Sequence, residues 1–130
     1  MSDRYQNLFR NIPEKDGIQE GLLLSIKKLG ELYYLQKDFQ NAMIVFARLN
    51  ALTDSLYQND LQNNDLYIAL GESYYTLADV QIILNLLQDA IINLERAGVI
   101  YLKLAEKLED ESYQKFYNSK IKPEIDRIKK

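Results

Sequence analysis

The chain contains the stretch Leu29-Gly30-Glu31-Leu32-Tyr33-Tyr34, and a close copy, Leu70-Gly71-Glu72-Ser73-Tyr74-Tyr75, follows 41 residues later with five of six positions identical. The same offset aligns Asp38-Phe39-Gln40 with Asp79-Val80-Gln81, where two of three positions match. Repetition of this kind indicates a fold made of stacked copies of one unit, because a single copy is too small to bury its own apolar face.

Apolar residues recur at spacings of three and four along most of the chain, which is the period of an α-helix. The 130 residues include only five glycines and two prolines, and no hairpin signal for β-strands is present. Each break between periodic segments supplies an Asp or Asn that can cap the next helix. The sequence therefore predicts an all-α fold of about six helices, over residues 3–11, 18–36, 38–57, 65–77, 80–108 and 111–130.

These helices are expected to form one domain over residues 1–130, as antiparallel hairpins stacked into a short solenoid. Residues 18–58 form the first hairpin, and residues 64–108 form the second, whose later helix is unusually long because no turn signal follows Val80. The second half of that long helix should hold the C-terminal helix of residues 111–130. Neither end of the stack has an obviously polar capping helix.

Single residues add local expectations. Tyr5 and Phe9, four residues apart, should pin the short first helix to the rest of the domain. Gly98 should mark a close approach of two backbones or a bend. The last helix should kink or restart at Pro123, since proline cannot continue the hydrogen-bond ladder of a helix.

The segment Leu29-Gly30-x-x-Tyr33, followed by Asp38-Phe39, Ala42 and Phe46, resembles the signature of a tetratricopeptide repeat. The resemblance covers about residues 18–94 and implies that Gly30 and Ala42 lie where the two helices of a hairpin cross closely. It also implies that Tyr33 and Phe46 fill the space beside them.

The second copy departs from this pattern. Ile83 stands where the first copy has Ala42, so the helices there are expected to cross less closely. The offset of 41 exceeds the common repeat of about 34 residues. It is similar to long-helix variants of the family, in which extra turns lengthen the second helix.

The resemblance also implies a partner-binding groove, because the first helix of each pair lines a concave surface in tetratricopeptide proteins. The matching residues are Leu24, Lys27, Glu31 and Tyr34 in one copy and Asp65, Ile68, Glu72 and Tyr75 in the other. The two tyrosines could equally be packing residues, and the two glutamates could be simply solvated. Family members that clamp a carboxylate usually use Asn and basic residues, so glutamates at these positions favour a basic or mixed apolar peptide.

Composition excludes most catalytic chemistry. The chain has no cysteine and no histidine, which removes disulfides, thiol chemistry and the commonest metal ligand. No phosphate-binding loop, dinucleotide fingerprint or serine with a histidine base is present. The run Glu109-Asp110-Glu111 could bind a hard cation, but its position at a turn favours helix capping. We therefore expect no catalytic residue, no metal site and no cofactor.

Charge and hydropathy limit the partners. The net charge is −3, which argues against general nucleic-acid binding, and no apolar run is long enough to span a membrane. Residues 1–7 lack the features of a secretory signal, so a cytoplasmic location is expected. From Ser112 onward six cations face two carboxylates. This segment is either a solvated basic helix or a tail that docks on an acidic neighbour.

The leading hypothesis is a protein–protein interaction module: an adaptor, assembly factor or chaperone, without enzymatic activity, that binds a peptide or helix of another protein. One alternative is a structural subunit of a homo-oligomer or of a larger complex. Another is a helical accessory subunit of a nucleoprotein complex that uses the basic tail.

Overall fold

The computed structural model describes residues 16–130, and the fold over these residues is all-α, as predicted, with no strand among them. The elements are α2 (Asp16–Leu35), α3 (Phe39–Gln58), α4 (Asn64–Ile83), α5 (Leu87–Lys107), α6 (Glu111–Phe116), η1 (Tyr117–Ile121) and α7 (Lys122–Lys129). The last three follow one another without a break and form one C-terminal helix, in which η1 is a π-helical turn. The helix predicted over 3–11, with Tyr5 and Phe9, lies outside the described residues.

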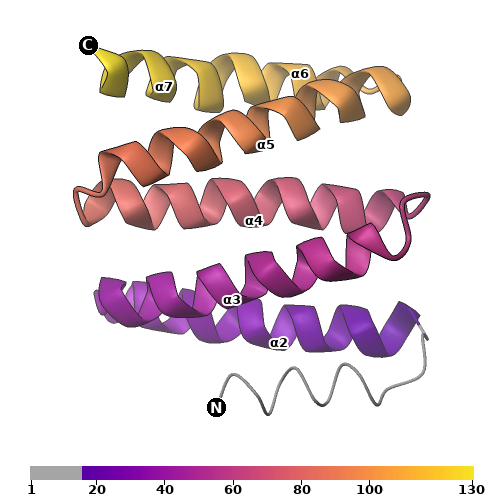
Figure 1. Cartoon of the computed structure of the whole chain (residues 1–130), viewed down its shortest axis with the longest axis horizontal. Helices are drawn as coiled ribbons and strands as arrows, with labels where there is room; N and C mark the ends of the chain where they lie inside the picture. The colour runs from indigo at the N-terminus through magenta and orange to yellow at the C-terminus, as the bar shows by residue number, and fades with distance from the viewer. Residues whose placement is uncertain (1–15) are drawn as a thin grey trace.

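The helices pack in chain order, each against the next (Figure 1). α2 and α3 form one antiparallel hairpin, α4 and α5 form a second, and the C-terminal helix lies along α5. The sequence predicted hairpins over residues 18–58 and 64–108, stacked on one another. The consecutive packing of the helices confirms this stacked arrangement. In the view of Figure 1 α3 lies in front of α2, so these two helices occupy different layers.

One turn geometry closes three of the helices. Lys37, Asn85 and Glu109 have φ angles of 61°, 62° and 50°, in the left-handed region that non-glycine residues seldom adopt. The residue after each donates its backbone N–H to a carbonyl five residues earlier: Asp38 to Tyr33 (2.9 Å), Leu86 to Gln81 (2.7 Å) and Asp110 to Ala105 (3.2 Å). This is the Schellman arrangement, which satisfies the last carbonyls of a helix.

Asp and Asn side chains begin three of the helices. The carboxylate of Asp38 accepts from the backbone N–H of Asn41 (3.3 Å), and the amide oxygen of Asn63 accepts from that of Leu66 (3.0 Å). Asp110 accepts from the N–H of Ser112 (2.9 Å), which confirms its capping role. The hydrogen bonds to Ser112 lower the pKa of Asp110.

The second hairpin differs from the prediction. Its first helix does not stop at residue 77 but continues to Ile83, so the helix predicted over 80–108 is wrong, and α5 is only 21 residues long. Asp79, taken from the sequence as a helix start, lies inside α4, and its carboxylate accepts a hydrogen bond from the Tyr34 hydroxyl. The real turn was missed because α5 has no side-chain cap at Leu86.

The turn positions show that the structural repeat is longer than 41 residues. Lys37 and Asn85 end equivalent helices and are 48 residues apart. The same offset aligns Ala42 with Ala90, both 0% exposed. The copied Gly-Glu-x-Tyr-Tyr motif therefore occupies positions that differ by seven residues, about two helical turns, in its two helices. Ile83 is not at a helix crossing; it is 43% exposed at the end of α4.

Three glycines sit where two helices touch. A Cβ at Gly30 would overlap the ring of Phe46, so the close crossing implied for Gly30 is confirmed. At Gly71 a Cβ would lie 2.8 Å from Cγ2 of Ile100. At Gly98 it would lie 2.9 Å from Cε1 of Tyr117, which confirms the expected close approach.

The C-terminal helix is held by an aromatic cluster. Tyr101 of α5 stacks on Phe116 with ring centroids 4.7 Å apart, and Tyr113 lies 6.0 Å away, so the predicted contact between α5 and the last helix is confirmed. Ile121 is 0% exposed in the same core. The helix does not restart at Pro123: the π-helical turn η1 leads directly into α7, which has Pro123 in its first turn.

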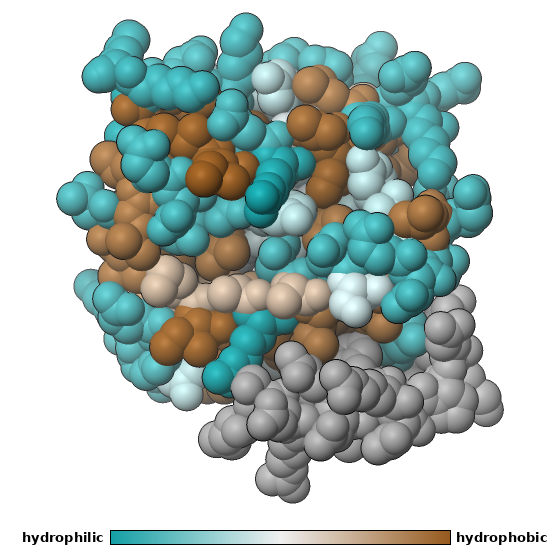
Figure 2. All heavy atoms as spheres, in the orientation of Figure 1, coloured by the Kyte–Doolittle hydropathy of each residue, from teal (hydrophilic) through white to brown (hydrophobic). Residues whose placement is uncertain are grey.

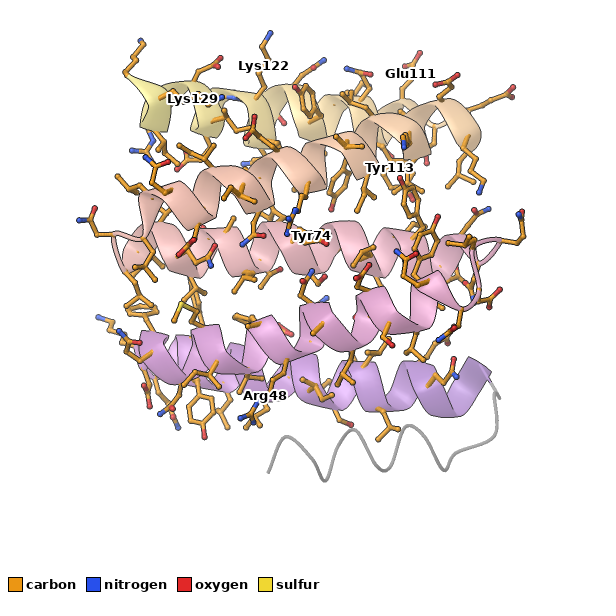
Figure 3. All side chains as sticks on the ribbon, viewed as in Figure 1. Arg48, Tyr74, Glu111, Tyr113, Lys122 and Lys129 are labelled. Carbon is orange, nitrogen blue, oxygen red and sulfur yellow. The ribbon has the colours of Figure 1, made fainter. Side chains whose placement is uncertain are left out.

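The expectation that neither end is capped by a polar helix is wrong for this end. The exposed residues of 111–129 are all polar or charged except Pro123. In Figure 3 the side chain of Lys122 points away from the other helices. Lys129 forms a salt bridge with Glu95 of α5 (3.5 Å). The C-terminal helix thus closes the stack with a hydrophilic face.

Candidate protein-binding groove

Two adjoining hollows run between α2 and α4, with α3 beneath them. One is lined by Gln19, Glu20, Leu23, Asn63, Asp65, Leu66 and Ala69. The other, of about 180 Å³, is lined by Glu20, Leu23, Leu24, Lys27, Leu49, Thr53, Ala69, Glu72, Ser73 and Thr76. Because Glu20, Leu23 and Ala69 line both hollows, we treat them as one surface and call it the α2–α4 groove.

The structure brings four of the sequence-predicted residues together in this groove: Leu24, Lys27, Asp65 and Glu72. Leu24 is 50% exposed, a large fraction for a leucine, and lies at the groove wall. The floor contains Leu23 and Leu49, each only 7% exposed. An exposed leucine thus stands beside a buried apolar floor.

The polar groups of the floor are already paired. The hydroxyl of Thr53 donates to the carbonyl of Leu49 (2.7 Å). Ser73 donates to the carbonyl of Leu70 (2.8 Å) and accepts from the side-chain amide of Asn50 (2.9 Å). Because these hydroxyls are satisfied within the fold, the polar contacts available to a ligand come from the walls.

Tyr34 lies farther along α2 and links its two neighbours. Its hydroxyl donates to Oδ2 of Asp79 in α4 (3.1 Å), and its ring packs edge-on against Phe39 at a centroid distance of 5.4 Å. Burial, and then the nearby Asp79 carboxylate, raises the pKa of Tyr34. Tyr34 does not line the hollows; it bridges α2 and α4 beyond them.

Besides Tyr34, three of the predicted residues do not line the groove. Tyr75 packs edge-on against Phe116 and lines a separate hollow of about 310 Å³ between α4 and the C-terminal helix. Ile68 packs into the apolar cluster that also holds Leu108 and Tyr113. Glu31 is exposed and lines none of these hollows. The offset of 41 aligned Glu31 with Glu72, but in the structural repeat of 48 residues the position equivalent to Glu31 is Asp79.

Sequence reasoning missed Glu20 in the groove and misread Asp79, which lies on α4 beyond the groove. Glu20 lines both hollows, but the motif begins nine residues after it and gave no reason to include it. Asp79 was interpreted as a cap. The available signal was the seven-residue spacing of Asp65, Glu72 and Asp79, which places all three on one side of a continuous helix.

No family model, curated protein or solved structure matches the chain. None of the helices over residues 16–130 combines the length and the apolar character needed to cross a membrane. Within the same residues, no three His, Cys, Asp or Glu side chains are grouped as a metal site would require. What the chain binds must therefore be inferred from the shape and charge of the α2–α4 groove.

Proposed function

We propose that the protein is a protein–protein interaction module that binds a peptide or helix of a partner protein in the α2–α4 groove. The observation that carries the proposal is the half-exposed Leu24 beside the apolar floor of Leu23 and Leu49. Burying apolar surface gains roughly 25 cal/mol per Å², so a partner side chain seated here would stabilise the complex.

The charges of the groove favour a basic partner. Three carboxylates, Glu20, Asp65 and Glu72, line it against one cation, Lys27. Such an excess steers oppositely charged partners and penalises acidic ones. A peptide with Lys or Arg beside apolar side chains fits this combination, in keeping with an adaptor, assembly factor or chaperone.

The walls of the groove are preformed, which lowers the entropic cost of binding. α2 is held on α3 by the contact between Gly30 and Phe46, a residue only 1% exposed. α2 is tied to α4 by the hydrogen bond from Tyr34 to Asp79. A partner therefore meets a surface that needs little ordering.

The test is cross-linking in cells with a photoreactive amino acid at position 24 and, as a matched control, at position 44. Leu24 is 50% and Ile44 is 45% exposed, but Ile44 lies on α3 and does not line the groove. Figure 2 shows the side on which α3 lies in front of α2, where apolar patches are interrupted by hydrophilic side chains. A partner should be captured from position 24 and not from position 44.

The captured partner is then measured by calorimetry against Leu24→Asp and Ile44→Asp. Leu24→Asp should abolish binding, because it places a charge at the apolar contact, and Ile44→Asp should leave it unchanged. Equal capture from both positions, or equal loss in both variants, would place the binding surface elsewhere.

A structural role in a homo-oligomer is the alternative, and two exposed leucines of α2 favour it. Leu32 is 51% and Leu35 79% exposed. Exposed apolar side chains this close together can be covered by a second copy of the chain. Light scattering of the intact protein decides between the two functions, since a concentration-dependent dimer that Leu35→Asp dissociates would support the alternative.

A further inference from the structure

Helix α4 carries an ordered stripe of negative charge. Its charged residues are Asp65, Glu72 and Asp79, at intervals of seven, and it contains no Lys or Arg. Seven residues are close to two full turns, with a drift of only about 20°, so the three carboxylates lie along one side of the helix. At 1.5 Å per residue, neighbouring carboxylates are about 10.5 Å apart along the axis.

The stripe follows the groove. Asp65 lines the first hollow and Glu72 the second, and both side chains are exposed. Asp79 continues the line to the point where Tyr34 bridges α2 and α4. Among residues 16–130 neither Asp65 nor Glu72 takes part in a salt bridge. Their charges are therefore open to a partner.

The spacing selects the conformation of that partner. A helical ligand repeats a side-chain position every seven residues and also advances about 10.5 Å, so its cations stay in step with the stripe. On an extended strand, residues on one face repeat about every 6.6 to 6.8 Å, and neither one nor two repeats match the interval of about 10.5 Å between Asp65 and Glu72. A helix can therefore place cations against both of these carboxylates, whereas a strand with one cation at Asp65 misses Glu72 by about 3 Å.

The opposite wall restricts where the cations can lie. α2 contributes Lys27 to the groove, facing the carboxylates of α4. A ligand with cations on every side would be repelled by this lysine. The partner must carry its positive charge on one side only.

Resting on the proposed function, we propose that the α2–α4 groove recognises an amphipathic helix with Lys or Arg at a seven-residue interval facing Asp65 and Glu72. Apolar residues between the cations would face Leu24 and the floor at Leu23 and Leu49. The spacing of the charges gives the specificity, and the apolar contact adds affinity common to other sequences.

The test uses the full chain and two labelled helical peptides of one composition, measured by fluorescence anisotropy. One carries two lysines seven residues apart, and in the other the same lysines lie on different sides of the helix. Each exposed ion pair contributes little, but two in register, with Asp65 and Glu72, should make the first peptide bind about ten-fold more tightly. The variant Asp65→Asn with Glu72→Gln should remove this preference.

The matched control is Asp89→Asn with Glu106→Gln, which removes the same charge from exposed positions of α5 outside the groove. It should keep the ten-fold preference. Equal affinity for both peptides, no binding of either, or the same loss in the control variant would overturn the recognition of spacing. Cross-linking from position 24 would still report on the groove, so failure of this inference is distinct from failure of the proposed function.

Discussion

At the scale of single residues, Gly21 and Gly30 of α2 have opposite roles. Gly30 touches Phe46, which is 1% exposed and cannot move aside, whereas a Cβ at Gly21 would have nothing within 4 Å. The intrinsic helix preference is the same at both, since alanine is favoured over glycine by about 1 kcal/mol. The difference between the effects of alanine on stability at Gly30 and at Gly21 therefore measures how tightly α2 and α3 cross.

Gly30→Ala is expected to lower the free energy of unfolding by about 1 to 3 kcal/mol, because overpacking outweighs the gain in helix preference. Gly21→Ala should raise it by up to about 1 kcal/mol. Urea denaturation monitored by circular dichroism measures both. Equal stabilisation by the two substitutions would mean that the crossing is loose.

The left-handed residues at the helix ends also lie on this scale. Asn85 has a φ of 62°, in the left-handed region that asparagine tolerates. Lys37 at 61° and Glu109 at 50° occupy the same region, which lysine and glutamate rarely adopt. The left-handed conformation costs a residue with a Cβ roughly 1 to 2 kcal/mol, whereas glycine adopts it without this cost. Part of that difference is offset by the greater freedom of glycine in the unfolded chain.

Lys37→Gly and Glu109→Gly should each raise the free energy of unfolding by about 0.5 to 1 kcal/mol. The control is Lys28→Gly in the middle of α2, which should lower it by about 1 kcal/mol. Thermal and urea melts check the signs. If the three glycine variants were all destabilised alike, the left-handed turns would be absent in solution.

At the scale of elements, periodicity and capping residues predicted α2, α3 and the C-terminal helix to within a few residues. They failed to locate the turn between α4 and α5, because no capping residue marks the start of α5. The α4–α5 turn has no N-cap, and its only mark is Asn85, whereas Asp79 resembles a cap inside a helix. The repeated motif then misled the register, because Gly30 meets Phe46 while Gly71 meets Ile100.

The candidate site shows the same limit. Leu24, Lys27 and Glu72 all line the α2–α4 groove, since spacing gives the face of a helix. A central helix borders one groove on each side, and spacing alone does not tell which of the two grooves a given side chain lines. α4 has α2 on one side and the C-terminal helix on the other, and Tyr75 turns to the second.

The C-terminal helix is the element whose removal should change the behaviour of the chain most. It covers an apolar surface that includes Leu94, Ala97 and Tyr101. Deleting residues 112–130 should expose this strip and promote self-association, detected by sedimentation velocity. A truncated chain that stays monomeric and equally stable would contradict this role.

A point variant tests the same packing in case the truncated chain does not fold. Ile121→Asp places a charge at a position that is 0% exposed and should lower the free energy of unfolding by several kcal/mol, at least about 2. Lys122→Asp, one residue later on the exposed side, is the control and should have little effect. Similar losses from both would indicate that the helix is not docked in solution.

At the scale of the whole molecule, the response to alkali is set by tyrosines packed between helices. Burial raises the pKa of Tyr101 well above its ordinary value of 10.0. Burial is also the largest cause of the raised pKa of Tyr67, Tyr75 and Tyr113. These residues come from α4, α5 and α6, so their ionisation would act on the packing of all three helices together.

The sign of the effect follows from where the protons stay. Below pH 10 the tyrosines are neutral in both states and their contribution to stability is complete. Above pH 10 the unfolded chain releases protons that the folded chain retains, so the free energy of unfolding falls as pH rises. Each tyrosine that stays protonated in the fold contributes a slope of about 1.4 kcal/mol per pH unit.

We therefore expect urea denaturation to give nearly constant stability from about pH 8 to 9.5 and a steep fall above about pH 10. Tyr101→Phe keeps the ring contacts with Phe116 and Tyr113 and removes the ionisable hydroxyl. The slope of the fall should therefore decrease by the contribution of one tyrosine, about 1.4 kcal/mol per pH unit. The same variant should melt like the parent at pH 8 to within about 1 kcal/mol. If the parent and Tyr101→Phe lost stability at the same rate above pH 10, Tyr101 would ionise as freely in the fold as in the unfolded chain, and the helices around it would have to be open to water.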